Sequence, residues 1–136
     1  IAYDSHPDGV ILVTDAMSAM GLVPGNYQLG NMNVTKDEDR VYIEGTDTLA
    51  GSVITLDACI RNFIQFTNCS LIEALEAVTL HPAVLLGIEK TKGVIKPGAD
   101  ADLVLLSDDL FVKRVFVAGE EVDLESIDVQ VTEKFQ

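Results

Sequence analysis

The first patterned segment of the chain is an apolar run that ends in an acidic residue. In "GVILVTDAMSAMGL", four consecutive apolar residues, Val10 to Val13, are followed by Thr14 and a single carboxylate, Asp15. An apolar run without alternation is typical of a strand covered on both faces, as in a parallel sheet. The pattern predicts a strand over Val10–Thr14 whose carboxyl end presents Asp15 at a concave surface.

Short strands separated by turns are predicted on both sides of a helical middle section. Within residues 20–48, short apolar segments are interrupted by turn signals at Pro24-Gly25, Gly30-Asn31 and 37–39. Residues 92–122 alternate β-branched runs with Gly, Pro and Asp, which again favours short strands and turns. Residues 123–136 are interpreted as a tail. Because the helices lie between the two groups, the region of small strands is discontinuous in sequence.

The middle section carries helical periodicity and clear start and stop signals. Apolar residues recur every three or four positions after Ser52, which predicts a helix over 53–66. Ser70 and Glu73 have the spacing of a capping box and predict a second helix over 71–80. Pro82 suits the first turn of a further short helix that Gly87 closes.

The overall charge restricts the partners of the protein. The chain has nine basic and 22 acidic residues, which gives a net charge of −13. A protein surface this acidic repels nucleic acid. No apolar run approaches the roughly 18 residues that a membrane helix needs, so no membrane partner is expected. The mean hydropathy is nevertheless +0.27. Either some apolar surface packs against a partner, or many strands are buried within a compact domain.

The cysteines and the start of the chain bear on its location. Cys59 and Cys69 do not form a CxxC pair and fall in or beside the predicted helices. They are interpreted as free, buried thiols of a reducing compartment, which predicts a cytoplasmic protein. The chain opens at Ile1 with no signal-peptide pattern, and this is not expected to be a natural start.

Two segments contain candidate functional residues, each with a structural alternative. Asp15, at a predicted strand end, is suited to be a metal ligand or a general base, or else it caps a turn. In "TDTLAGSVITL", the small residues Ala50, Gly51 and Ser52 allow backbone N–H groups to approach a ligand. The alternative is that Ser52 only caps the helix that follows.

The two histidines do not predict a metal site. His6 and His81 lie far apart in the sequence, and neither belongs to an HxH or HxxxH motif. A transition-metal site needs several such ligands, so none is predicted from this chain alone. His81, which precedes Pro82, is expected at a helix junction, and His6 is expected in a loop.

Four stretches together resemble a known family. They are "LVTDAM" with "AMGL", "GTDTLAGSVITLDACIRNF", "LIEALEAVTLHPAVLLGIEKTKGVIKPGADADLVLL" and "VFVAGEEV". They resemble the C-terminal part of the N-acetylglucosamine-6-phosphate deacetylases, a family of the metal-dependent amidohydrolase superfamily. The resemblance extends from about residue 2 to about residue 122, and the combination of "LVTDA" with "TLAGS" is its most specific part.

The resemblance implies an α/β fold: the C-terminal fragment of a (β/α)8 TIM barrel plus part of a small β-sandwich domain. Residues 1–19 would hold the last barrel strand and the active-site Asp. Residues 20–48 and 92–122 would supply β-sandwich strands. Residues 49–91 would form barrel-associated helices, and 123–136 the tail.

The resemblance also implies an activity. The family deacetylates N-acetylglucosamine 6-phosphate, a small amino-sugar phosphate, to glucosamine 6-phosphate and acetate in amino-sugar metabolism. Asp15 matches its catalytic acid/base, and Leu49, Ala50 and Gly51 match residues that line the substrate pocket. The divalent metal of the family is held by one Glu and two His on earlier barrel strands, which have no counterpart here. The chain alone is therefore expected to lack metal ligands and activity.

Two alternatives remain open. The chain is suited to be a non-catalytic module that self-associates to cover an open strand edge, and a homo-oligomer is expected in either case. It would otherwise be part of another amidohydrolase, such as a dihydroorotase or a deaminase. The sequence "TLAGS" argues against this last alternative.

Overall fold

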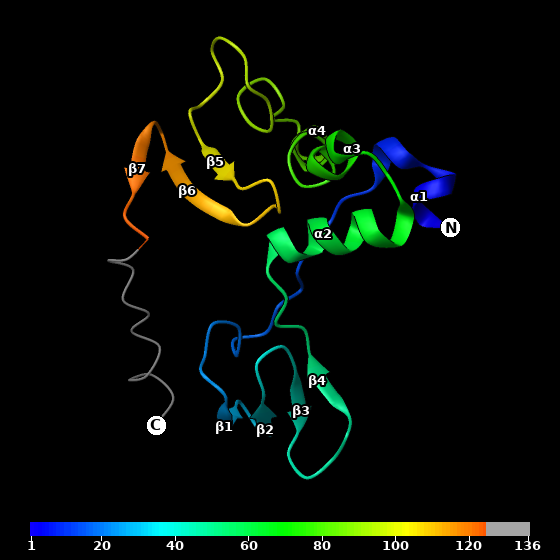
Figure 1. Cartoon of the computed structure of the whole chain (residues 1–136), viewed down its shortest axis with the longest axis vertical. Helices are drawn as coiled ribbons and strands as arrows, with labels where there is room; N and C mark the ends of the chain where they lie inside the picture. Colours follow the sequence, from blue (N-terminus) through cyan, green and yellow to red (C-terminus); the bar gives the residue numbers. More distant parts are fainter. Residues whose placement is uncertain (125–136) are drawn as a thin grey trace. The chain divides into compact units, whose positions relative to one another are not determined.

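The structure, a computed structural model, describes residues 1–124. These residues divide into two compact units, one formed by residues 14–55 and the other by residues 1–13 together with 56–124. Figure 1 shows the first unit as strands β1–β4 and the second as the helices with strands β5–β7. Residues 125–136 of the predicted tail lie outside the described part of the chain.

The unit formed by residues 14–55 is an antiparallel meander. Its strands β1 (Gly25–Leu29), β2 (Met32–Lys36), β3 (Val41–Ile43) and β4 (Leu49–Gly51) lie in the order β1-β2-β3-β4, each paired with the next. The predicted turn at Gly30-Asn31 joins β1 to β2, and Gly30 has a φ of +60°. Glycine takes this left-handed conformation without steric cost, and the hairpin closes with two loop residues. The strands predicted within 20–48 are thus present.

A small apolar core holds this meander together. Strand residues alternate between its two faces, and one face contributes buried apolar side chains that pack with residues of the preceding loop: Ala19, Leu22, Leu29, Val34 and Val41. Partly buried Met17, Tyr27, Ala50 and Val53 surround this cluster. The core therefore reaches both segments that carry the candidate residues.

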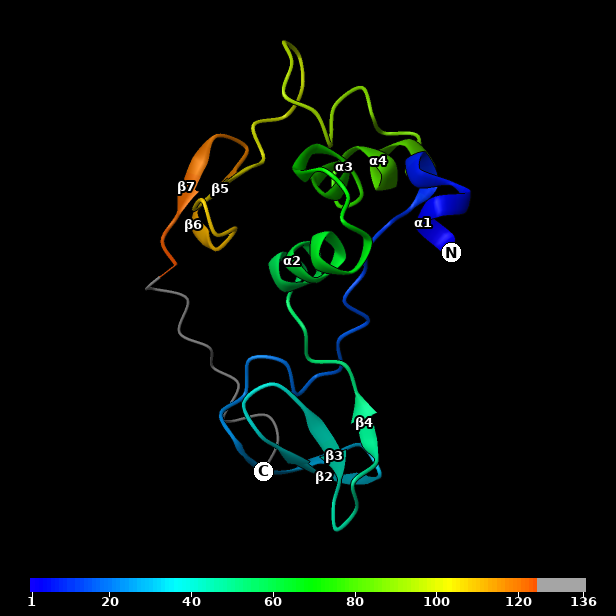
Figure 2. The same ribbon diagram turned by 45° about the vertical axis from the view of Figure 1, so that its right-hand side comes forward.

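The second unit combines short helices with a three-stranded sheet. Its helices are α1 (Ala2–Ser5), η1 (Pro7–Gly9), α2 (Leu56–Thr67), α3 (Leu71–Glu76) and α4 (Leu80–Leu86). Strands β5 (Leu103–Leu106), β6 (Val112–Val117) and β7 (Glu120–Val122) form an antiparallel sheet in that order. Figure 2 shows α2 beside α3 in this unit. The strands predicted within 92–122 are confirmed.

The helix predicted over 71–80 is divided in two. The capping box is present: the Ser70 hydroxyl accepts the Glu73 N–H, and the Glu73 carboxylate accepts the Ser70 N–H. The helix ends at Glu76, and α4 begins at Leu80. Pro82 has no N–H, and in a continuous helix its ring would clash with the carbonyl of residue 78. The helix is therefore interrupted before Pro82. Gly87 closes α4 at φ +71°, as predicted.

The helix predicted over 53–66 begins later, at Leu56. Residues 53–55 are Val, Ile and Thr, whose β-branched side chains favour extended backbone over a first helical turn. The Ser52 hydroxyl accepts the Ile54 N–H at 3.3 Å and does not cap α2. The interpretation of Ser52 as a helix cap is therefore wrong.

The strand predicted over Val10–Thr14 is not formed by the described residues. The Leu12 N–H donates to the Ala77 carbonyl at 3.0 Å, so the end of α3, and not a strand, lies beside this segment. A strand requires a neighbouring strand to complete its hydrogen bonds. The burial predicted for the apolar run is met only in part, because Val10, Ile11 and Leu12 are partly buried whereas Val13 is 70% exposed. The run also contains no information on which segment completes its hydrogen bonds.

The β-sandwich and the barrel remain predictions. Strands β1–β4 and β5–β7 are two separate sheets that belong to different units. Within residues 1–124, none of the helices has the length and apolar character needed to cross a membrane.

Candidate functional site

Asp15 lies in a strained turn at the start of the unit formed by residues 14–55. Its φ is +45°, a left-handed conformation that is uncommon outside glycine and is tolerated best by Asn and Asp. The Thr14 hydroxyl accepts the Ala16 N–H at 3.4 Å across this turn. The Asp15 side chain is exposed. Such strained residues gather at functional sites, where the surrounding structure holds them in place.

A parallel bridge joins the Asp15 turn to β4. Ala16 pairs with Ser52 in a parallel bridge, and the Met17 N–H donates to the Ser52 carbonyl at 2.8 Å. Asp15 and Gly51 therefore stand immediately before the same bridge, one on each segment. The structure thus brings together two of the four predicted site residues, although Ser52 lies 36 positions after Ala16 in the sequence.

Leu49, Ala50 and Gly51 form strand β4 at the edge of the meander. Ala50 packs against the core, whereas Leu49 is 58% exposed. The resemblance assigned 49–91 to helices, and the sequence predicted only that small residues just before a helix let backbone N–H groups approach a ligand; the helical assignment is wrong for Leu49–Gly51. They instead form an edge strand, which pairs with β3 on one side and leaves its other side without a strand neighbour among the described residues.

Met17 is a residue that the sequence did not single out. A Cβ placed on Gly51 would lie 2.9 Å from the Met17 sulfur, closer than real Cβ atoms approach other atoms. The thioether therefore lies directly against the Gly51 α-carbon. The only sequence signal for this contact is the absence of a side chain at Gly51, which does not identify its partner.

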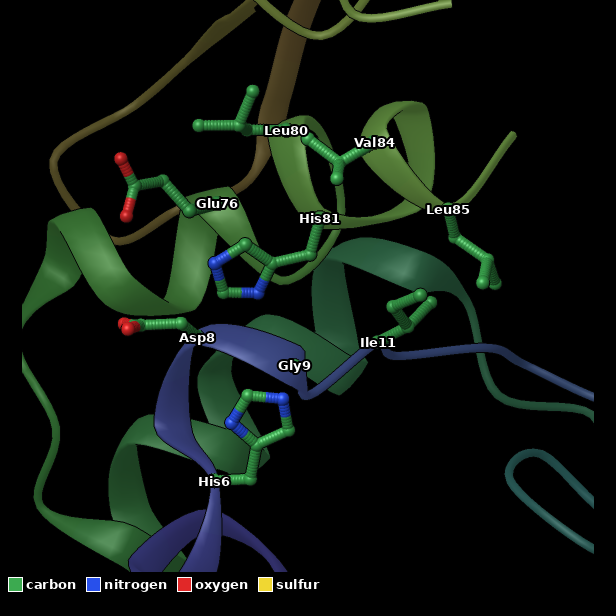
Figure 3. Close-up of a pocket in the computed structure, with 9 residues that line it drawn as sticks. All are labelled: His6, Asp8, Gly9, Ile11, Glu76, Leu80, His81, Val84 and Leu85. Carbon is green, nitrogen blue, oxygen red and sulfur yellow. The ribbon is translucent and has the colours of Figure 1, made fainter. Parts of the chain in front are cut away.

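The two histidines line one pocket in the other unit. Figure 3 shows the rings of His6 and His81 with the carboxylates of Asp8 and Glu76 around a pocket of about 520 Å³. His81 Nδ1 lies 2.8 Å from the Val10 carbonyl oxygen, which can only accept, so Nδ1 carries the proton. His81 is the second residue of α4, next to the connection from α3, and His6 connects α1 to η1; both positions agree with expectation.

The residues present do not fit a metal ion. Among residues 1–124, no three His, Cys, Asp or Glu side chains gather closely enough to hold one, and the histidine pocket is no exception. A structural or catalytic zinc needs at least three protein ligands. A metal at Asp15 would require ligands from outside the described residues.

Both cysteines are free thiols. Cys69 is buried in the helical core with Ile60 and Ala74. Cys59 is partly buried, its sulfur lies 4.0 Å from the Val13 carbonyl oxygen, and burial together with the charge of Asp57 raises the pKa of its thiol. A raised pKa disfavours the reactive thiolate of Cys59, and the Cys69 side chain is buried, so neither environment favours a nucleophile.

The sequence as a whole matches a known protein family. Residues 10–122 match the amidohydrolase family, and the chain belongs to that family. Among curated relatives, it is 52% identical over 122 residues to the N-acetylglucosamine-6-phosphate deacetylase of Rattus norvegicus and 50% identical to that of Homo sapiens. It is 35% identical over 111 residues to a putative N-acetylgalactosamine-6-phosphate deacetylase of Escherichia coli.

Solved structures give the same result. The N-acetylglucosamine-6-phosphate deacetylase of Thermotoga maritima matches with a TM-score of 0.75 and 37% identity, over 88% of this chain and 32% of that one. The Mycobacterium smegmatis enzyme, solved as a mutant in complex with N-acetyl-D-glucosamine-6-phosphate, matches with a TM-score of 0.73 and 34% identity, over 85% of this chain and 31% of that one. The matches to the rat and human enzymes cover 90% of this chain but only 30% of each relative.

Proposed function

We propose that this chain contributes the acid/base and part of the substrate site to a metal-dependent N-acetylglucosamine-6-phosphate deacetylase of the cytoplasm. The observation that carries the proposal is the parallel bridge between Ala16 and Ser52, which joins the Asp15 turn to Leu49–Gly51. The 52% identity to the rat deacetylase supports the same reaction and favours glucosamine over galactosamine as the sugar. The free thiols fit a reducing compartment.

Asp15 is assigned the proton transfers of amide hydrolysis. Its carboxylate accepts a proton as water attacks the acetamide carbonyl, and it then donates that proton to the leaving amine. The C–N bond breaks, and the products are the free amine and acetate. The exposed position of Asp15 leaves the carboxylate accessible to a substrate, and the strained turn fixes the backbone that carries it.

The open edge of β4 is assigned to the substrate. An edge strand has main-chain N–H and C=O groups available for a ligand, and such groups orient polar substrates well. Because Gly51 and Asp15 flank the same bridge, a sugar bound at β4 has its acetamide within reach of the carboxylate.

A divalent metal ion is part of the proposal, but the described residues 1–124 contain no set of ligands for it. When bound, such an ion supplies Lewis-acid activation of water in enzymes of this type. Since residues 1–124 assemble no ligand set, the ligands are assigned to the part of the enzyme that this chain does not match.

The test is a chimaera of the rat deacetylase in which the 122 matched residues of this chain replace their counterparts. The chimaera should release acetate from N-acetylglucosamine 6-phosphate, with the galactosamine epimer assayed beside it. Asp15→Asn should reduce turnover by roughly 10²–10⁴, the usual contribution of a general acid/base. The matched control is Asp39→Asn on an exposed turn of the same unit. Equal turnover in both variants would remove Asp15 from the mechanism.

Self-association is a second role that one observation favours. Several large apolar side chains of the helical unit are strongly exposed, among them Phe66 at 78%, Leu85 at 75% and Ile95 at 90%. Exposed apolar area costs roughly 25 cal/mol per Å² in water. We expect the isolated chain to sediment as a dimer or larger oligomer at micromolar concentration, and a stable monomer would contradict this.

A further inference from the structure

The contact between Met17 and Gly51 connects the two segments on which the proposed function rests. The Met17 N–H donates to the Ser52 carbonyl at 2.8 Å, and the Met17 sulfur lies against the Gly51 α-carbon. Met17 also packs against the buried core of the meander. The side chain therefore contacts both the core and β4, two residues after Asp15.

Few other contacts determine where the Asp15 carboxylate stands. Among residues 1–124, no hydrogen-bond donor holds this carboxylate, and its side chain is exposed. Its position follows from its own backbone, which is fixed by the Thr14 hydroxyl on one side and by the bridge at Ala16 and Met17 on the other. A change in the spacing between Met17 and β4 is thus transmitted directly to Asp15.

We propose that Met17 is a positioning residue of the deacetylase site. Its side chain is the spacer that sets the distance between the acid/base, Asp15, and the substrate-binding strand at Gly51. This inference rests on the proposed function. Proton transfer requires the acid/base to stand within hydrogen-bond reach of the reacting atoms, and a misplacement of about 1 Å costs about a hundredfold in rate.

The spacer model predicts compensation between two side chains. Met17→Ala removes the thioether and loosens the spacing, and we expect kcat of the chimaera to fall by about tenfold. Gly51→Ala adds a methyl group that meets the Met17 sulfur and should cause a similar loss. The φ of Gly51 lies outside the left-handed region, so alanine fits the backbone there. In the double variant the new methyl group occupies space vacated by the thioether, and kcat should recover at least about threefold over either single variant.

Two further variants separate positioning from simple packing. Met17→Leu keeps the volume and should retain kcat within about threefold of the parent chimaera. Gly25→Ala is a matched glycine substitution in the same meander: its new Cβ would have only ordinary contacts, the nearest at 3.6 Å to the Tyr27 ring. It should leave kcat unchanged. Because the spacer orients the acid/base, the losses should fall on kcat, with KM changed less than about threefold.

The outcomes distinguish this inference from the proposed function. The proposed function is contradicted if the chimaera is inactive, or if its turnover is the same with and without Asp15→Asn. The spacer is then tested on the 136-residue chain by hydrogen exchange of the Met17 amide, which should accelerate about tenfold in Gly51→Ala and recover in the double variant. If the chimaera is active and depends on Asp15, two results overturn the spacer: an unchanged kcat in Met17→Ala, or a double variant no better than Gly51→Ala alone. The latter would mean that the methyl group blocks substrate directly.

Discussion

The hydroxyl of Tyr3 donates a hydrogen bond of 2.7 Å to Oε1 of Glu73, 70 positions further along the chain. The other oxygen of Glu73 accepts the N–H and the hydroxyl of Ser70, at 2.8 and 2.7 Å. One carboxylate thus closes the capping box of α3 and fixes α1 to it. The Tyr3 ring meets Phe63 of α2 edge-on, with 5.5 Å between ring centroids. Three helices are joined at this point.

This bond makes the stability of the helical unit dependent on pH at the alkaline end. The bond to Glu73 raises the pKa of Tyr3 to about 12, with burial as the second cause, whereas an unfolded chain has a tyrosine pKa of about 10. A pKa raised by folding stabilises the folded state fully below about pH 10, and this contribution is lost as the pH rises from 10 toward 12. Urea titrations should show a stability difference between the parent and Tyr3→Phe that shrinks over this window.

A direct measurement accompanies the stability comparison. The difference between the tyrosinate absorbance of the parent chain and that of Tyr3→Phe isolates the titration of Tyr3, with an expected midpoint near 12. Because Glu73 is the main cause of the shift, Glu73→Gln should move this midpoint down toward 10. A midpoint that stays near 12 in Glu73→Gln would show that burial, and not the carboxylate, raises the pKa.

Gly93 and Gly98 form a matched pair of glycine substitutions. Both have positive φ, +76° and +90°, so alanine is strained at either position. A Cβ at Gly93 would also lie 2.5 Å from the Thr79 carbonyl oxygen, whereas one at Gly98 would meet nothing within 4 Å. Gly98→Ala should cost about 1 kcal/mol, and Gly93→Ala about 2 kcal/mol or more. Thermal unfolding should separate the two variants by about 4–8 °C, and equal melting temperatures would contradict the close packing at Gly93.

The features that the sequence predicted correctly are those with local causes. The capping box at Ser70 and Glu73, the helix stop at Gly87 and the hairpin turn at Gly30 each depend on residues within a few positions of one another. Their chemistry is complete in the sequence itself. The structure therefore reproduces them where they were predicted.

The features that the sequence did not predict depend on distant residues. The apolar run at Val10–Thr14 indicates burial, but whether it becomes a strand depends on a neighbouring strand that no local pattern specifies. The pairing of Ala16 with Ser52 and the packing of Met17 on Gly51 are contacts of the same kind. The roles of Asp15 and Leu49–Gly51 came from resemblance to a family, because spacing alone left each of them with a structural alternative.

Arg61 joins α2 to the turn before β6. Its guanidinium donates to Asp57 and to the Leu110 carbonyl, both at 2.8 Å, and lies over the Phe111 ring with 4.2 Å to the centroid. Leu110 has a φ of +64°, so this turn is strained and needs an external support. A lysine ammonium cannot make the two bonds and the stacking contact together. We expect Arg61→Lys to lower the free energy of unfolding by about 1–2 kcal/mol.

The control for Arg61 is a second arginine in a similar setting. Arg114 lies over the Phe116 ring with 5.0 Å to the centroid and pairs with Glu121, but it is 51% exposed, against 28% for Arg61. Solvent screens an exposed pair of this kind, so Arg114→Lys should lose less stability than Arg61→Lys. Chemical denaturation of both variants measures the difference. The reverse order would show that Arg61 does not support the Leu110 turn.

The 136-residue chain by itself should neither retain a catalytic metal nor release acetate from N-acetylglucosamine 6-phosphate. Among the residues that the structure describes, no three metal-binding side chains converge. A lone exposed carboxylate does not generate hydroxide from water without a bound metal ion. The measurement is acetate release by the purified chain with added Zn²⁺, Fe²⁺ or Co²⁺, together with metal analysis after dialysis. The active control is the chimaera with the rat enzyme, prepared and dialysed in the same way. If turnover co-purifies with the chain and disappears in Asp15→Asn, the metal ligands must come from a second copy, and the isolated chain would then be an enzyme whose site is shared between copies.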